Sequence, residues 1–105
     1  MNSEAESFNK EAIAEIAARD VEGLAKAHLS YGHSWKKRGG VGAFMMLARK
    51  WDRLETAVNR AGYNVFAAIE GDRRAEGVMD DIRDLRRYLL LVESECGGTV
   101  PEVKK

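Results

Sequence analysis

The stretch from residue 31 to residue 55, YGHSWKKRGGVGAFMMLARKWDRLE, concentrates side chains whose types and spacing could do chemistry. Arginine and lysine bind phosphate, aromatic rings stack on bases, and the exposed N–H groups at a helix start attract anions. The stretch therefore predicts a site for a phosphorylated nucleotide. The candidate binding residues are Tyr31, His33, Trp35, Lys36, Arg38, Arg49, Lys50 and Arg53.

Simpler interpretations apply to the same residues. The basic residues Lys36–Arg38 and the glycines that follow are also typical of an exposed loop that needs to turn. Tyr31 and Trp35 are large enough to cover a hydrophobic core instead of a base. No Gly-x-x-x-x-Gly-Lys-Ser/Thr pattern is present, so the glycines do not indicate a P-loop.

Carboxylates form a second group of candidates. At about 100° per residue, Phe44, Ala48, Trp51 and Val58 share one side of a helix. Glu55 falls inside this apolar sector and Asp52 lies near its edge. Because burying an unpaired carboxylate is costly, an inward Glu55 needs a cation, a metal ion or a proton.

A later segment carries matching acids. Asp81, Asp84 and Tyr88 are spaced three and four residues apart, so they share a helix face, while Asp80 is expected to face water. If the two helices pack antiparallel, Asp52, Glu55, Asp81 and Asp84 could meet as oxygen ligands for Mg²⁺, with Tyr88 in the same pocket. The alternative is a set of ordinary surface pairs between these acids and nearby arginines. The residues assign no catalytic group.

Periodicity predicts the elements that carry these residues. Apolar residues recur every three to four positions over about 5–29, 41–61 and 76–96, and 63–70 reads as a half-helix. No strand pattern competes. We expect an all-α fold: a small antiparallel bundle of three main helices plus a short connecting helix. Residues 1–105 would form a single helical domain with loose tails at 1–8 and 98–105.

Composition narrows the class of protein. The chain has 105 residues, with 17 basic and 17 acidic side chains, so no overall field favours duplex nucleic acid. The single cysteine, Cys96, excludes a disulfide framework. No apolar run approaches the length of a membrane span. We expect a cytoplasmic protein that makes no membrane contact, and a chain this small is expected to stabilise itself as a homo-oligomer.

The carboxylate spacing resembles that of a known family. Asp52-x-x-Glu55 followed by Asp81-x-x-Asp84 is similar to the signature of MazG-like all-α nucleotide pyrophosphohydrolases, which bind Mg²⁺ and split nucleoside triphosphates. Residues 28–95 resemble the phage-rich family called nucleotide modification associated domain 1. That likeness rests on Tyr31-Gly32-His33-Ser34-Trp35, then Lys50 and Arg53, then Asp81, Asp84 and Tyr88.

Departures from the family pattern bear on activity. Trp51 stands where the first MazG-like glutamate would be, and Asp52 and Asp81 replace glutamates and shorten their reach. His33 replaces the usual aspartate of the loop. A weakened acid set impairs metal-dependent hydrolysis but leaves phosphate recognition by cationic side chains intact.

Three functions follow as hypotheses. The first is a nucleotide-binding protein without turnover, which in an infected bacterial host would sequester a nucleotide immune signal, such as a cyclic nucleotide, as an anti-defence sponge. The alternative is an Mg²⁺-dependent, MazG-like nucleoside triphosphate pyrophosphohydrolase acting in nucleotide metabolism or modification. The third is a helical interaction module whose apolar seams mediate assembly.

Overall fold

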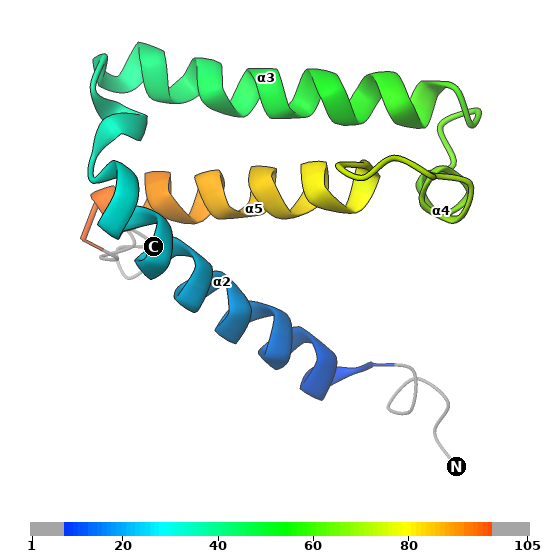
Figure 1. The fold of residues 1–105 in the computed structure, drawn as a ribbon, viewed down its shortest axis with the longest axis horizontal. Helices are drawn as coiled ribbons and strands as arrows, with labels where there is room; N and C mark the ends of the chain where they lie inside the picture. The colour runs from blue at the N-terminus through cyan, green and yellow to red at the C-terminus, as the bar shows by residue number, and fades with distance from the viewer. Residues whose placement is uncertain (1–7, 98–105) are drawn as a thin grey trace, which may run out of the picture. The chain divides into compact units, whose positions relative to one another are not determined.

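The computed structural model describes residues 8–97, and this part of the chain is helical without a strand (Figure 1). Four α-helices and one 3-10 turn follow in the order α2 (Lys10–Tyr31), η1 (Ser34–Lys36), α3 (Gly39–Asn59), α4 (Val65–Glu70) and α5 (Val78–Glu95). The all-α prediction is confirmed. The predicted helix start at residue 5 and the two tails fall largely outside the described residues.

Polar caps explain where α2 and α4 begin. The Asn9 side chain accepts a hydrogen bond from the Ala12 N–H at 3.0 Å at the start of α2. Asn64 does the same for the Ala67 N–H at 3.0 Å at the start of α4. These bonds satisfy N–H groups that have no partner inside the helix.

Left-handed backbone marks where helices end. Gly32, with φ +56°, follows α2, and its N–H donates to the His28 carbonyl at 2.8 Å. After α3, Gly62 and Tyr63 both have positive φ, +66° and +63°. Glycine adopts this region freely, whereas tyrosine does so at a cost. The Tyr63 conformation is accompanied by a hydrogen bond from its N–H to the Val58 carbonyl at 2.9 Å.

The chain separates into two compact units, residues 1–34 and residues 35–105. The first contains α2. The second contains α3, α4 and α5, and within it α3 packs along α5 in the antiparallel sense (Figure 1). The candidate chemistry of α3 and α5 can therefore be analysed within the second unit.

The side of α3 that packs differs from the expected side. Phe44 and Trp51 are 63% and 52% exposed, and Glu55 is exposed as well, so the expected inward position of Glu55 is wrong. Ala43 is buried instead, and Leu47 and Leu54 are half-buried at the same helical spacing. The physical reason is that α3 is apolar on two sides, and periodicity alone does not say which one meets α5.

On α5, the first half of the predicted seam is confirmed. Val78 is buried at 2% exposure, and Ile82 and Leu85 are half-buried. Leu89 is 49% exposed, so the seam opens toward the end of the helix. Asp80 does not simply face water: it is half-buried and its carboxylate accepts the Gly77 N–H at 2.9 Å.

Within residues 8–97 no helix has the length and apolar character needed to cross a membrane.

Candidate functional site: an arginine pocket beside the α3–α5 ion pairs

Two ion pairs join the middle of α3 to the first half of α5. Arg53 Nε lies 2.9 Å from Asp81 Oδ1, and Lys50 Nζ lies 3.1 Å from Asp84 Oδ2. The partners are three residues apart on each helix, as an antiparallel pairing requires. Asp81 is 1% exposed, so its charge is compensated where water does not reach it.

These ion pairs occupy two of the four carboxylates that were predicted to bind Mg²⁺. Asp81 and Asp84 face cations of α3, and Asp84 also accepts Arg83 Nη2 at 3.3 Å. Asp52 and Glu55 are exposed. Across the described residues, no three carboxylate, histidine or cysteine side chains are placed so that they could hold a metal ion. The four acids predicted to converge on Mg²⁺ are therefore not gathered, and as arranged they do not fit such a site.

One oxygen of the buried acid is left over. Within residues 8–97, Asp81 Oδ2 is buried and has no hydrogen-bond partner, while Oδ1 receives the Arg53 bond. The same bond raises the pKa of Arg53 above its ordinary value. Asp81 thus holds the guanidinium of Arg53 in place by accepting a hydrogen bond from Arg53 Nε.

The aromatic and basic loop lies away from these pairs. Lys36 Nζ contacts both carboxylate oxygens of Glu95, at 2.9 and 2.7 Å, beside the end of α5. Arg38 immediately precedes α3, where its side chain makes no capping hydrogen bond, and it is separated from Arg53 by about 22 Å along the helix, at about 1.5 Å per residue. Lys36 and Arg38 are therefore not brought together with Arg53 in one chain.

Tyr31 and His33 belong to the first unit, whereas Trp35 begins the second. The His33 ring lies edge-on to His28, with ring centroids 4.9 Å apart. Trp35 is half-buried and carries Lys36 Nζ at 6.0 Å from its ring centroid. Tyr88 is half-buried on α5. These placements leave the predicted stacking role of Tyr31 and Trp35 a prediction.

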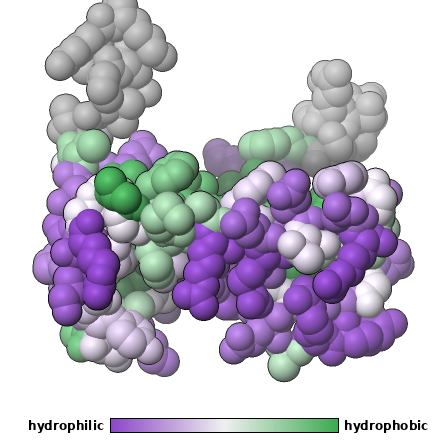
Figure 2. All heavy atoms as spheres, turned by 90° about the horizontal axis from the view of Figure 1, so that it is seen from above, coloured by the Kyte–Doolittle hydropathy of each residue, from purple (hydrophilic) through white to green (hydrophobic). Residues whose placement is uncertain are grey.

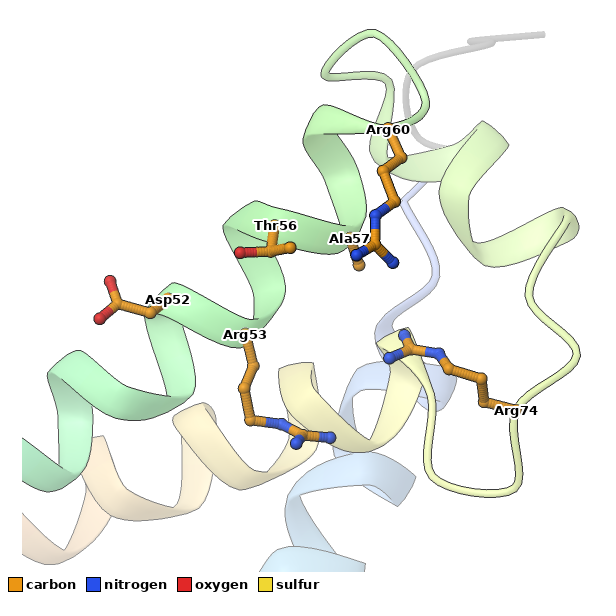
Figure 3. Close-up of a pocket in the computed structure, with 6 residues that line it drawn as sticks. All are labelled: Asp52, Arg53, Thr56, Ala57, Arg60 and Arg74. Carbon is orange, nitrogen blue, oxygen red and sulfur yellow. The ribbon is translucent and has the colours of Figure 1, made fainter.

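A cavity of about 280 Å³ opens beside the C-terminal half of α3. It is lined by Asp52, Arg53, Thr56, Ala57, Arg60 and Arg74. Figure 3 shows the guanidinium groups of Arg60 and Arg74 directed toward the same space between α3 and the segment that precedes α5, while the Asp52 carboxylate points away. Three arginines from two segments therefore surround one opening, which we call the arginine pocket.

Asp72 fixes the third arginine of the pocket. Its Oδ1 accepts Arg74 Nε at 3.0 Å and the Arg74 N–H at 3.1 Å, and its Oδ2 accepts the Val78 N–H at the start of α5. These bonds, led by the one from the Arg74 side chain, hold the pKa of Asp72 well below its usual range and raise that of Arg74. One carboxylate thus orients Arg74 and caps α5.

Glycine at position 77 makes this arrangement fit. A Cβ added to Gly77 would overlap the Asp72 carboxylate. The residue before α5 must therefore lack a side chain for Asp72 to reach both Arg74 and the first turn of the helix.

Arg60 and Arg74 were missed by reasoning from the sequence. A signal for Arg60 was present, because Arg49, Arg53 and Arg60 are spaced four and seven apart and so share one side of a helix. No local pattern could find Arg74, since its position depends on how the segment after α4 returns to α3.

Compared with known proteins, the chain matches no family model, no curated protein and no solved structure. The fold and the site define a class of protein: an all-α chain in which an antiparallel helix pair is joined by two partly buried ion pairs and carries an arginine-lined pocket on its side.

Proposed function

We propose that this protein binds a phosphorylated nucleotide in the arginine pocket and holds it without hydrolysing it. The observation that carries the proposal is the convergence of Arg53, Arg60 and Arg74 on one cavity. Guanidinium groups bind phosphate through paired, charge-assisted hydrogen bonds, and three of them suit a group with several anionic oxygens.

The hydrogen bonds of the pocket leave donors free for a ligand. Arg53 uses Nε on Asp81, and Arg74 uses Nε and Nη2 on Asp72, so terminal N–H groups remain on both. Within residues 8–97, Arg60 makes no ion pair. Two arginines are therefore held in position by carboxylates, and the third contributes an uncompensated charge.

Binding without turnover is supported by the state of the acids. Asp81 and Asp84 are engaged by Arg53 and Lys50, and Asp52 and Glu55 lie exposed on α3. Of the four acids that the family likeness would assign to Mg²⁺, Asp81 and Asp84 instead hold cations of α3. The resemblance to a phage-rich family suggests the purpose: sequestering a nucleotide signal, linear or cyclic, inside an infected bacterial cell.

One observation favours the alternative, a metal-dependent pyrophosphohydrolase. Asp81 Oδ2 is buried without a partner in the described chain, and a cation would satisfy such an oxygen. Among residues 8–97, the other carboxylates that could bind a metal ion do not gather around Asp81 Oδ2, so hydrolysis is the second candidate function.

A thermal-shift screen of linear and cyclic nucleotides, with and without Mg²⁺, followed by chromatographic product analysis, tests the proposal. Nucleotides should raise the melting temperature without Mg²⁺, because a ligand that binds the folded state stabilises it, and they should be recovered intact. Release of pyrophosphate in Mg²⁺ would establish the hydrolase instead. If no nucleotide shifts the melting temperature, a helical interaction module becomes the better description.

A further inference from the structure

Helix α3 presents a second apolar side that no described residue of its own unit covers. Val41 is 78% exposed, Phe44 63%, Met45 57% and Trp51 52%. Together with the half-buried Ala48, each lies three or four residues from another member of the set, so they form a continuous stripe along the helix. We call these five residues the outer stripe.

The view onto α3 shows where this surface lies. In Figure 2, hydrophobic atoms gather left of the centre, between hydrophilic atoms at the left edge and the hydrophilic atoms that dominate the right. The contrast with the interior is sharp, because the buried hydrophobic residues in the described part of the chain are Ala43, Ala68 and Val78. Phe44, Met45 and Trp51 of α3 are thus exposed, whereas Leu47 and Leu54 are half-buried on the opposite side.

The outer stripe is large enough to be an interface. From the exposed fractions, its four large side chains present on the order of 500 Å², near the upper size of the biggest apolar patch on a typical monomer. Flanking polar residues bring the surface toward the roughly 800 Å² that each partner contributes to a stable complex.

Charge along the same helix indicates which partner fits. Lys37 and Arg38 precede α3 and are exposed, and Asp52 and Glu55 are exposed in its C-terminal half. At about 100° per residue, Asp52 and Glu55 lie on the side of the outer stripe, whereas the exposed Arg49 and Arg53 lie on another side of the helix. When two copies of α3 lie antiparallel on this stripe, the basic start of each helix therefore faces Asp52 and Glu55 of the other. A parallel arrangement would instead place like charges side by side.

The centre of the stripe also suits this arrangement. Ala48 is its smallest residue, and Met45 and Trp51 lie three residues before and after it. In an antiparallel pair crossing at Ala48, Met45 of one copy lies at the same level along the interface as Trp51 of the other, twice, and both side chains are long enough to reach across it. Sulfur–aromatic contacts of this kind are favourable.

We propose that a second copy of this chain docks on the outer stripe, with the two α3 helices antiparallel about a two-fold axis. Such an interface is isologous, because the same residues serve both sides. This interface does not depend on the proposed function, because self-association of the chain is measured in the absence of nucleotide.

The first test is the solution mass of the full chain by light scattering and sedimentation over a range of concentrations. We expect a dimer or an even-numbered assembly built from dimers.

Phe44→Glu should weaken association roughly 30-fold or more, the loss typical of a central aromatic interface residue. Since Phe44 is exposed, the variant should keep its helical circular dichroism. The matched control is Phe66→Glu on α4, where Phe66 is 79% exposed, and it should associate like the parent.

The second test addresses the orientation. Arg38→Glu and Glu55→Arg should each weaken association several-fold, and the double variant should restore it by exchanging the charges. A monomer at every concentration, or association unchanged by Phe44→Glu, overturns the proposal. Failure of the double variant to restore association overturns the antiparallel pairing of the two α3 helices, and with it the proposed two-fold interface.

Discussion

At the scale of single residues, the arrangement depends on carboxylates that hold arginines. Asp81 is almost fully buried and binds Arg53, and Asp72 binds Arg74. Arg60, the third arginine of the pocket, is free of such a contact within residues 8–97. The same residue types had suggested a metal site, but the acids that face α3 are paired with cations. The residue types therefore indicated a charged site. The pairing of the acids with Arg53 and Lys50 shows that these acids hold cationic side chains.

Arg60 is the residue whose loss should affect ligand binding most cleanly. Arg60→Ala removes a charged donor without leaving a carboxylate unpaired, so the fold should persist. We expect nucleotide affinity measured by calorimetry to fall about tenfold, as the loss of a hydrogen bond to a charged group implies. Arg38→Ala, at the other end of α3, serves as the comparison. If Arg38→Ala weakens binding and Arg60→Ala does not, the ligand site is the loop before α3.

Asp81 should be needed for the shape of the pocket. Asp81→Asn removes the charge that orients Arg53 while retaining an oxygen that can accept its hydrogen bond. We expect weaker nucleotide binding and a lower melting temperature, with no metal required for the parent's affinity. Tighter binding by the variant would mean that Asp81 repels the ligand rather than positions Arg53.

At the scale of elements, the start of α5 couples stability to the pocket. Asp72 accepts the first N–H of the helix and also orients Arg74, and Asp80 accepts the Gly77 N–H. Gly77 has φ −110°, so the requirement for glycine comes from the nearby carboxylate rather than from its backbone angle.

A pH dependence follows from the Asp72 carboxylate. Its pKa in the folded state lies below the value of about 3.9 expected for the unfolded chain, so its ionised form stabilises the fold above that pH. This contribution is lost as pH falls from about 4 toward the folded-state pKa. Asp72→Asn should therefore lower the melting temperature at pH 7, and the difference from the parent should shrink below pH 4. A difference that grows with acidity would contradict the assignment.

Gly77→Ala should disturb the same cap by steric means. The added methyl group would displace Asp72, release Arg74 and uncap α5. We expect a lower melting temperature and weaker ligand binding together. The control is Ala75→Gly in the exposed segment before α5, which adds no atoms and should leave binding intact.

Packing within the second unit offers a further comparison. Val78 is 2% exposed, and its neighbour Met79 is 60% exposed. Val78→Ala should cost about 1–3 kcal/mol in the free energy of unfolding, whereas Met79→Ala should stay within about 0.5 kcal/mol. Denaturant titration of the two variants measures this contrast, and equal losses would mean that α5 packs on a different face.

At the scale of the whole molecule, little apolar surface is buried within one chain. The buried hydrophobic residues among positions 8–97 are small or branched. On α3, Phe44, Met45 and Trp51 are exposed, and Leu47 and Leu54 are only half-buried. A chain that buries this little gains stability when copies associate.

The melting temperature should therefore depend on protein concentration. Between about 1 and 100 μM we expect it to rise by several degrees, because association of folded chains is favoured by mass action. Differential scanning fluorimetry at several concentrations provides the measurement. A melting temperature that stays constant over this range would show that the single chain is sufficient for its own stability.

Local patterns in the sequence were enough to locate the helices and several of their ends. Apolar spacing predicted α2, α3 and α5, and the polar and glycine-rich segments marked the breaks between them. These features depend on interactions over a few residues, so they can be read without knowing the fold. The cationic character of α3 and the acids of α5 were recognised in the same way.

The tertiary structure decided which sides of the helices meet. Because α3 is apolar on two sides, its sequence allowed either to face α5; packing chose Ala43, Leu47 and Leu54 and left Phe44 and Trp51 outside. That rotation turned Glu55 outward and set Lys50 and Arg53 against acids. It also let Arg74, distant in sequence, join Arg60 beside one cavity. Helical periodicity is local, whereas the choice of face depends on the shape and charge of the partner helix.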